Sequence, residues 1–237
     1  MHIMLMVLIL VIIYFFSLIV IFTYRDKINI KIGNLVFVIL NGIIFGLLNL
    51  YYYNHGGLEH FLTLDNISPM MFTTMMLIYF MHPKVKDCYL CAASLLSFGM
   101  FIAMLVNPNF AYLFNFKQQA TLDYMYDSLN HLIFAVFGVY LVITKQVKIG
   151  INTIKKAAIW IYSIVTFGVI LNFVFHKSFF GMNPYGKYSI YMLDIFGSFW
   201  ITLLAYYLGI FVVLILGSQF NYLWECIMKH DEKKNNF

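Results

Sequence analysis

The sequence has very few charged side chains: only 11% of its 237 residues are Asp, Glu, Lys or Arg. Soluble domains usually carry about 25% charged residues. Conversely, 62% of the residues are hydrophobic and the mean hydropathy is +0.83. A soluble globule could not bury this much apolar surface, so the composition predicts a protein whose solvent is hydrocarbon. The apolar segments leave no room for a folded soluble module, and we therefore expect a single domain.

Cysteine is also scarce, with only Cys88, Cys91 and Cys226 in the chain. We expect all three on the cytoplasmic side as free thiols, which excludes a disulfide framework. Cys88 and Cys91 have the CxxC spacing of redox and zinc motifs. No second pair and no βαβ context accompany them, so we interpret them as ordinary thiols.

Seven apolar runs approach the length of about 20 residues that a membrane-spanning helix needs. They cover residues 3–24, 34–53, 67–81, 89–106, 126–143, 157–175 and 198–216. The first run has neither a basic n-region nor a small-residue cleavage site, so we expect it to be retained as a helix. The pattern predicts an all-α bundle of about seven spans over residues 1–216, followed by a cytoplasmic tail over residues 217–237. Four glycines are predicted to mark close helix contacts: Gly42, Gly46, Gly138 and Gly168.

Basic residues are distributed unevenly between the two ends of these spans. Only three of the fifteen lie at one end, namely Lys117, Lys177 and Lys187. The other twelve lie in the loops or the tail at the opposite end: Arg25, Lys27, Lys31, Lys84, Lys86, Lys145, Lys148, Lys155, Lys156, Lys229, Lys233 and Lys234. Because basic loops stay in the cytoplasm, we predict the N-terminus outside and the C-terminus inside. The same distribution accounts for the net charge of +5 without a nucleic-acid partner, and the sequence has no nucleic-acid motif.

The candidate catalytic residues lie at the beginning of the fifth span. Asp127 and His131 are four residues apart, which places them on one face of a helix. An imidazole oriented by a carboxylate is the usual general base for activating a hydroxyl or a water molecule. Ionisable groups inside a span usually face the bundle interior or a wet cavity. We therefore predict His131 as the base and Asp127 as its orienting group; the alternative is that His131 caps a helix end and pairs with an amide.

The outer loops hold most of the polar residues that are not basic, so we expect any site to open to the outer face. The candidate substrate-binding residues are Asn130, Asn172, Asn183, Asp194 and Trp200, with a membrane lipid as the expected partner and no cofactor. Structural alternatives exist for two of them: an interhelical hydrogen bond for Asn172 and a charge at a helix N-terminus for Asp194.

A small outer-loop cluster could in principle bind a metal ion. It consists of His55, Glu59 and His60. Zinc sites need three or four ligands in fixed geometry, and this spacing matches no strong metal motif. We therefore expect a solvated loop and no metal site.

Four sequence patches resemble the YwaF-type integral membrane proteins of low-GC Gram-positive bacteria. They are NISPMMFTTM in the third span, YMYDSLNHLIFAVFGVYLV in the fifth, VILNFVF in the sixth and SIYMLDIFGSFWITLLAYYL at the seventh. The family is distantly similar to a eukaryotic multi-pass acyltransferase that remodels ether phospholipids. The resemblance therefore implies lipid acyl transfer in the cell membrane of a Gram-positive bacterium. The family positions that match are His131, Asn172, Asn183, Leu193, Asp194, Gly197 and Trp200.

The chain departs from this family at the expected nucleophile. Members of that family commonly carry a His-Leu-Cys motif at the start of the third span, where this sequence has Met71, Phe72 and Thr73. Either a hydroxyl of Thr73 or Thr74 substitutes for the cysteine, or the protein is not an acyltransferase. A hydroxyl without a closely placed base is a weak nucleophile. A small-solute transporter and a non-catalytic membrane partner are the alternative functions.

Overall fold

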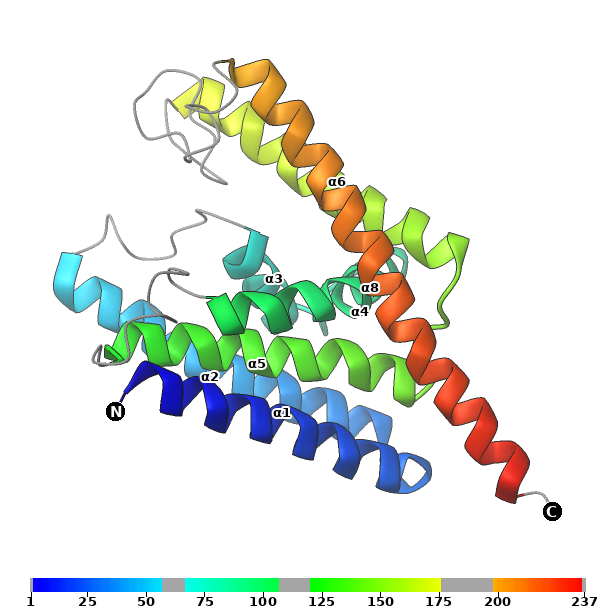
Figure 1. Ribbon diagram of the computed structural model, residues 1–237. Coiled ribbons are helices and arrows are strands. Elements are labelled where there is room, and N and C mark those ends of the chain that lie inside the picture. Colours follow the sequence, from blue (N-terminus) through cyan, green and yellow to red (C-terminus); the bar gives the residue numbers. More distant parts are fainter. Residues whose placement is uncertain (1, 57–66, 107–119, 176–197, 236–237) are drawn as a thin grey trace.

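The computed structural model describes residues 2–56, 67–106, 120–175 and 198–235. These residues form seven α-helices and one 3-10 helix, without any strand in the described ranges (Figure 1). The elements are α1 (Ile3–Tyr24), η1 (Arg25–Lys27), α2 (Ile30–Gly56), α3 (Ile67–Met76), α4 (Pro83–Val106), α5 (Leu122–Ile143), α6 (Ile151–Phe175) and α8 (Phe199–Asn235). The all-α fold class that the sequence predicts is confirmed.

Six of the described helices, all except α3, are long and apolar enough to cross a membrane. Their outward faces carry large apolar side chains that water would not tolerate in such number: Ile12 is 59% exposed, Phe16 66% and Leu204 61%. Contiguous apolar surface of this kind requires a hydrocarbon environment. The chain is therefore a multi-pass membrane protein.

The third predicted span, residues 67–81, is helical only over Ile67–Met76. Ten residues rise about 15 Å, which is half of a hydrocarbon core of about 30 Å. A turn over residues 77–80 follows the helix, and Tyr79 within it donates a hydrogen bond of 3.4 Å to the Lys31 carbonyl at the beginning of α2. Phe72 and Ile78 in this segment are buried. The segment therefore lies at the edge of the bundle: one side packs against the other helices, whereas Leu77 and Phe80 on the other side are 51% and 86% exposed.

Side chains from two neighbouring helices hold α3 in place. Asn41 of α2 donates from Nδ2 to the Phe72 carbonyl at 2.9 Å. The Tyr89 hydroxyl of α4 donates to the Met71 carbonyl at 3.1 Å. Hydrogen bonds between a side chain and the backbone of another helix are a common means of fixing helix positions in membranes. The orientation of α3 is therefore set by α2 and α4.

Helix α4 lies at the centre of the bundle and packs against α5, α6 and α8 (Figure 1). Its contact surface is made of small, fully buried residues such as Ala93 and Ser97. A Cβ atom at Gly138 of α5 would overlap the Ala93 carbonyl, and one at Gly217 of α8 would overlap the Leu95 carbonyl. Small residues allow this close approach of helix backbones. The prediction of a close contact at Gly138 is confirmed.

Two other glycines of the sequence prediction do not mark such contacts. A Cβ atom at Gly42 would meet only the terminal methyl of Met76 at 4.0 Å, and one at Gly46 would meet nothing within 4 Å.

The sequence analysis also overlooked Asn221, which is fully buried in α8. Its Nδ2 donates to the Ser94 carbonyl at 2.6 Å and to Ser97 Oγ at 3.2 Å, and so joins α8 to α4.

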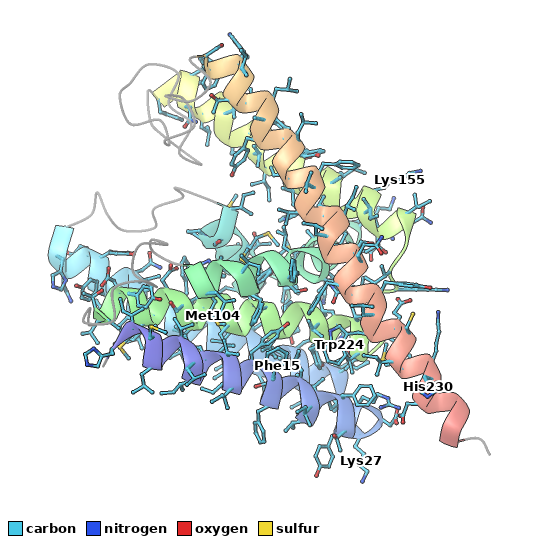
Figure 2. All side chains as sticks on the ribbon, in the orientation of Figure 1. Phe15, Lys27, Met104, Lys155, Trp224 and His230 are labelled. Atoms are coloured by element: carbon cyan, nitrogen blue, oxygen red, sulfur yellow. The ribbon has the colours of Figure 1, made fainter. Side chains whose placement is uncertain are left out.

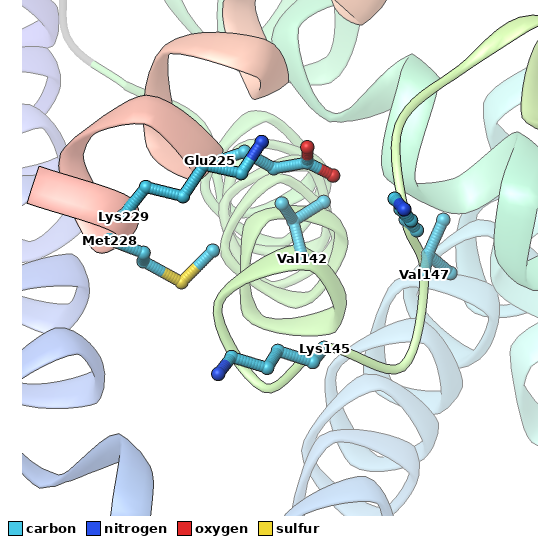
Figure 3. Close-up of a pocket in the computed structure, with 7 residues that line it drawn as sticks. Val142, Lys145, Val147, Glu225, Met228 and Lys229 are labelled. Atoms are coloured by element: carbon cyan, nitrogen blue, oxygen red, sulfur yellow. The ribbon is translucent and has the colours of Figure 1, made fainter. Parts of the chain in front are cut away.

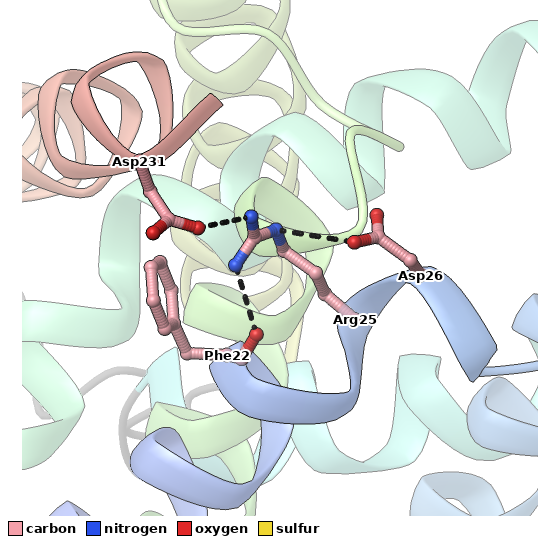
Figure 4. Close-up of polar contacts among 4 residues, drawn as sticks. All are labelled: Phe22, Arg25, Asp26 and Asp231. Carbon is pink, nitrogen blue, oxygen red and sulfur yellow. Dashed lines mark hydrogen bonds and ion pairs between the residues drawn. The ribbon is translucent and has the colours of Figure 1, made fainter. Parts of the chain in front are cut away.

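Helix α8 continues past Leu216 to Asn235, so most of the predicted tail extends the last membrane helix. An ion pair connects the C-terminal part of α8 to η1 (Figure 4). Arg25 donates from Nη2 to Asp231 Oδ2 at 2.6 Å and from Nη1 to the Phe22 carbonyl at 3.1 Å. The Arg25 side chain is only 10% exposed. A charge-assisted bond of this length is stronger than a neutral one, and here it closes the basic end of the bundle.

The described basic residues occupy the helix ends and connections on one side of the bundle. Figure 2 shows Lys27, Lys155 and His230 in the right-hand part of the view, where α1, α5 and α8 end and α6 begins. The positive-inside rule predicts that this end faces the cytoplasm. The three cysteines are all free thiols.

We expect Gly138→Ala to destabilise the bundle by about 1–3 kcal/mol, the usual penalty for overpacking a close contact. The measurement is the midpoint of unfolding of the purified protein in detergent. Gly46→Ala is the matched control: it changes a helix glycine with open space around it, where alanine has the better helix propensity. Equal midpoints for the two variants would contradict the packing of α4 on α5.

Candidate functional site

His131 is buried on α5, with 5% of its surface exposed, and both ring nitrogens have polar neighbours. Nδ1 lies 2.8 Å from the carbonyl oxygen of Asp127 and 3.5 Å from its carboxylate Oδ1. Nε2 lies 3.0 Å from Oγ of Ser68 at the beginning of α3. The Phe72 ring meets the imidazole edge-on, with 5.3 Å between the ring centroids. The structure thus joins the predicted pair to a serine from another helix.

These contacts determine which ring nitrogen of a neutral His131 carries the hydrogen. A carbonyl oxygen can only accept a hydrogen bond, so Nδ1 carries the hydrogen and donates it to Asp127. Nε2 of the neutral ring is then an acceptor, and the Ser68 hydroxyl donates to it. In this state the histidine can take the proton of a nucleophilic serine. The group that orients the ring is the backbone carbonyl of Asp127, whereas the carboxylate that the sequence predicted for this role lies 3.5 Å from Nδ1.

Ser68 is placed where three helices converge. It is the second residue of α3, and its Oγ lies 3.5 Å from Met100 Sδ of α4 as well as beside His131 of α5. Pro69 follows it; a proline is tolerated in the first helical turn because amides there have no carbonyl partner within the helix. The N-terminal end of a helix carries partial positive charge, which favours an anion near Ser68.

The two threonines that the sequence offered as substitute nucleophiles are engaged elsewhere. Thr73 Oγ1 donates to the Pro69 carbonyl at 2.9 Å, and Thr74 Oγ1 donates to the Met70 carbonyl at 2.7 Å. Such bonds to the preceding helical turn are a usual state for threonine in a helix. Sequence reasoning missed Ser68, although it lies in the same patch of the third span.

Asn130 is the second predicted polar residue of this part of α5, and it is fully buried. Neither Oδ1 nor Nδ2 has a hydrogen-bond partner in the described part of the chain. Leaving a buried polar group unpaired costs about 1–3 kcal/mol. An unpaired buried amide next to His131 in the sequence is a candidate for binding a polar group of a substrate.

The remaining predicted residues do not join this cluster. Asn172 is fully buried near the end of α6, and Trp200 is 66% exposed at the beginning of α8, stacked on Phe173 at 6.2 Å between centroids. Figure 1 shows these ends of α6 and α8 well separated from α5. The predicted meeting of spans five to seven is therefore absent from the described residues, because α6 and α8 pack on α4 and diverge from α5 there.

Several predictions fall on residues that the structure does not describe. Asn183 and Asp194 lie outside the described residues, as do Leu193 and Gly197 of the family patches. Glu59 and His60 of the outer-loop cluster also lie outside them. Within the described ranges, no group of three or more His, Cys, Asp or Glu residues could hold a metal ion.

Comparisons with models of known protein families, with curated proteins and with solved structures find no match for this chain. Fold and geometry define its class: a multi-pass α-helical membrane protein in which the buried His131 lies between the partly buried Ser68 and Asp127. A function is therefore proposed from this cluster itself.

We expect Asn130→Leu to raise the unfolding midpoint, because it removes a buried amide that has no partner at a cost of about 1–3 kcal/mol. Asn221→Leu is the matched control and is expected to lower the midpoint, since Asn221 makes two hydrogen bonds to α4. Thermal unfolding in detergent measures both. A lower midpoint for Asn130→Leu would show that Asn130 is paired in the folded protein.

Proposed function

We propose that the protein transfers acyl groups between lipids near the outer leaflet, with Ser68 as nucleophile, His131 as general base and Asp127 as the group that orients His131. The observation that carries the proposal is the distance of 3.0 Å between Ser68 Oγ and His131 Nε2. A nucleophile and its base are expected within about 2.6–3.2 Å of each other. In the YwaF-type proteins the cysteine lies at the position of Thr73. In this proposal Ser68, five residues earlier in the chain, takes its role.

The reaction proceeds in two balanced steps. Ser68 Oγ attacks the ester carbonyl of a donor lipid while His131 Nε2 accepts the hydroxyl proton. The ester bond breaks, the leaving alkoxide takes the proton from His131, and the acyl group stays on Ser68. An acceptor hydroxyl then attacks this acyl-enzyme, His131 accepts its proton, and Ser68 recovers it as the acyl group leaves.

The surroundings of Ser68 suit the negative charge that develops on the attacked carbonyl oxygen. The positive end of α3 lies at Ser68, and preorganised dipoles are effective where water is excluded. Asn130 supplies a buried amide without a partner in the described chain, and we assign it to a polar group of the substrate. Asn172 and Trp200 have no part in this proposal, because they lie on the separate end of α6 and α8.

The depth of the site fits a lipid substrate. A helix rises about 1.5 Å per residue, so His131 lies about 8 Å beyond Tyr126, where the apolar part of α5 was predicted to begin. By the positive-inside assignment, this part of α5 faces the outer leaflet. Ester groups of phospholipids lie just below the headgroups and can reach this depth from the outer side.

We expect a fluorophosphonate probe to label the purified protein at Ser68, because such probes react with serines that a neighbouring base activates. Peptide mass spectrometry locates the adduct. Ser68→Ala should remove it, and His131→Ala should slow labelling by about 100-fold or more, the contribution of a general base. Transfer of a fluorescent acyl chain between phospholipids in vesicles should fall in parallel.

Thr73→Ala is the matched control, because it removes a hydroxyl of the same helix that is bonded to its own backbone. It should leave both labelling and transfer unchanged. Undiminished labelling of Ser68 in His131→Ala, or labelling of Thr73 in place of Ser68, would contradict the proposed roles.

A further inference from the structure

A cavity of about 240 Å³ lies at the basic end of the bundle, between the end of α5, the segment after it and α8. Figure 3 shows Glu225 and Lys229 of α8 on one side of Val142, with Lys145 and Val147 on the other sides. The cavity belongs to the opposite half of α5 from His131. It is thus separate from the proposed acyl-transfer site.

Three lysines and one glutamate line this cavity: Lys145, Lys148, Lys229 and Glu225. The lysines are exposed, whereas Glu225 is only 8% exposed and its Oε1 accepts the Ile149 backbone N–H at 2.6 Å. Among the described residues, Lys148 and Lys229 form no ion pair. Among the described lining residues, lysines thus outnumber carboxylates, and the carboxylate of Glu225 accepts a backbone N–H.

The backbone at Lys145 shows that a lysine is placed here against local preference. The N–H of Lys145 donates to the Val142 carbonyl at 3.0 Å, and that of Gln146 to the Leu141 carbonyl at 2.9 Å, which is the Schellman ending of a helix. Lys145 occupies its left-handed position, with φ 59°, where glycine is usual.

The floor of the cavity is apolar. Val142 is 1% exposed, Val147 4% and Met228 5%, and all three line it together with the lysines. Ammonium groups beside an apolar lining match an amphiphile that has a phosphate in its headgroup and acyl chains attached through glycerol. Cavities at the ends of membrane helices lie at the level of the lipid headgroups.

We propose that this cavity binds one anionic phospholipid of the cytoplasmic leaflet, with its phosphate held by Lys145, Lys148 and Lys229. Basic pockets between membrane helices on the cytoplasmic side are suited to anionic headgroups. Each lysine ammonium offers three donors to phosphate oxygens. A free phosphate has the same oxygen chemistry but gains nothing from the apolar floor, so the lipid is the favoured source.

Native mass spectrometry of the full chain in neutral detergent, with phosphatidylglycerol or phosphatidylcholine added, tests this site. We expect phosphatidylglycerol to bind at least about tenfold better, since a basic cluster discriminates by charge. The variant with Lys145→Gly, Lys148→Gln and Lys229→Gln should bind it about 100-fold more weakly, because each lysine contributes roughly a factor of five. Lys84→Gln with Lys86→Gln is the matched control on the same side of the membrane and should bind like the unmodified chain.

The single variant Lys145→Gly separates binding from folding. Glycine suits the left-handed position, so this variant should unfold at a higher temperature and yet bind phosphatidylglycerol about fivefold more weakly. Binding of the triple variant within twofold of the unmodified chain, or equal binding of phosphatidylcholine, would overturn the proposal. Displacement of phosphatidylglycerol by millimolar inorganic phosphate would assign the site to free phosphate and overturn it as well.

Discussion

The close packing of α4 against α5 is the constraint on which the position of His131 depends. Gly138 lets α5 approach the Ala93 carbonyl of α4 so closely that a Cβ atom would not fit. His131 lies seven residues earlier, two helical turns away, and therefore on the same face of α5. Once Gly138 turns this face toward α4, His131 points to the place where Ser68 and Met100 meet. A contact between small residues thus orients a polar group two turns away.

Hydrocarbon as a solvent explains the rest of the arrangement. A buried polar group without a hydrogen-bond partner destabilises the protein in such surroundings. The buried amides of Asn41 and Asn221 accordingly donate hydrogen bonds to backbone carbonyls of neighbouring helices. The short helix α3 can present Ser68 inside the membrane only because α2 and α4 hold and cover it. Asn130 differs from these two amides, because neither its Nδ2 nor its Oδ1 has a partner among the described residues, and it lies next to His131 in the chain.

Run length and charge bias were sufficient to predict the helices and the basic end. They could not predict where the segment at residues 67–81 leaves the helix, because the sequence remains apolar through the turn. For the same reason, the loss of hydropathy after Leu216 suggested a tail, although the helix continues. The pairing of Asp127 with His131 follows from helical spacing alone. Ser68 is 63 residues away from His131, and no local pattern encodes contacts between distant helices.

The central claim is that Ser68 donates its hydroxyl hydrogen to Nε2 of a neutral His131. The most direct measurement is the ¹⁵N NMR spectrum of the imidazole nitrogens in protein labelled at histidine. The His131→Gln variant assigns the His131 resonances, and the Ser68→Ala variant shows which of them depends on Ser68. The account predicts a ring protonated at Nδ1, with an unprotonated Nε2 whose resonance shifts when Ser68 is removed. A ring protonated at Nε2, or an Nε2 resonance indifferent to Ser68→Ala, would contradict it.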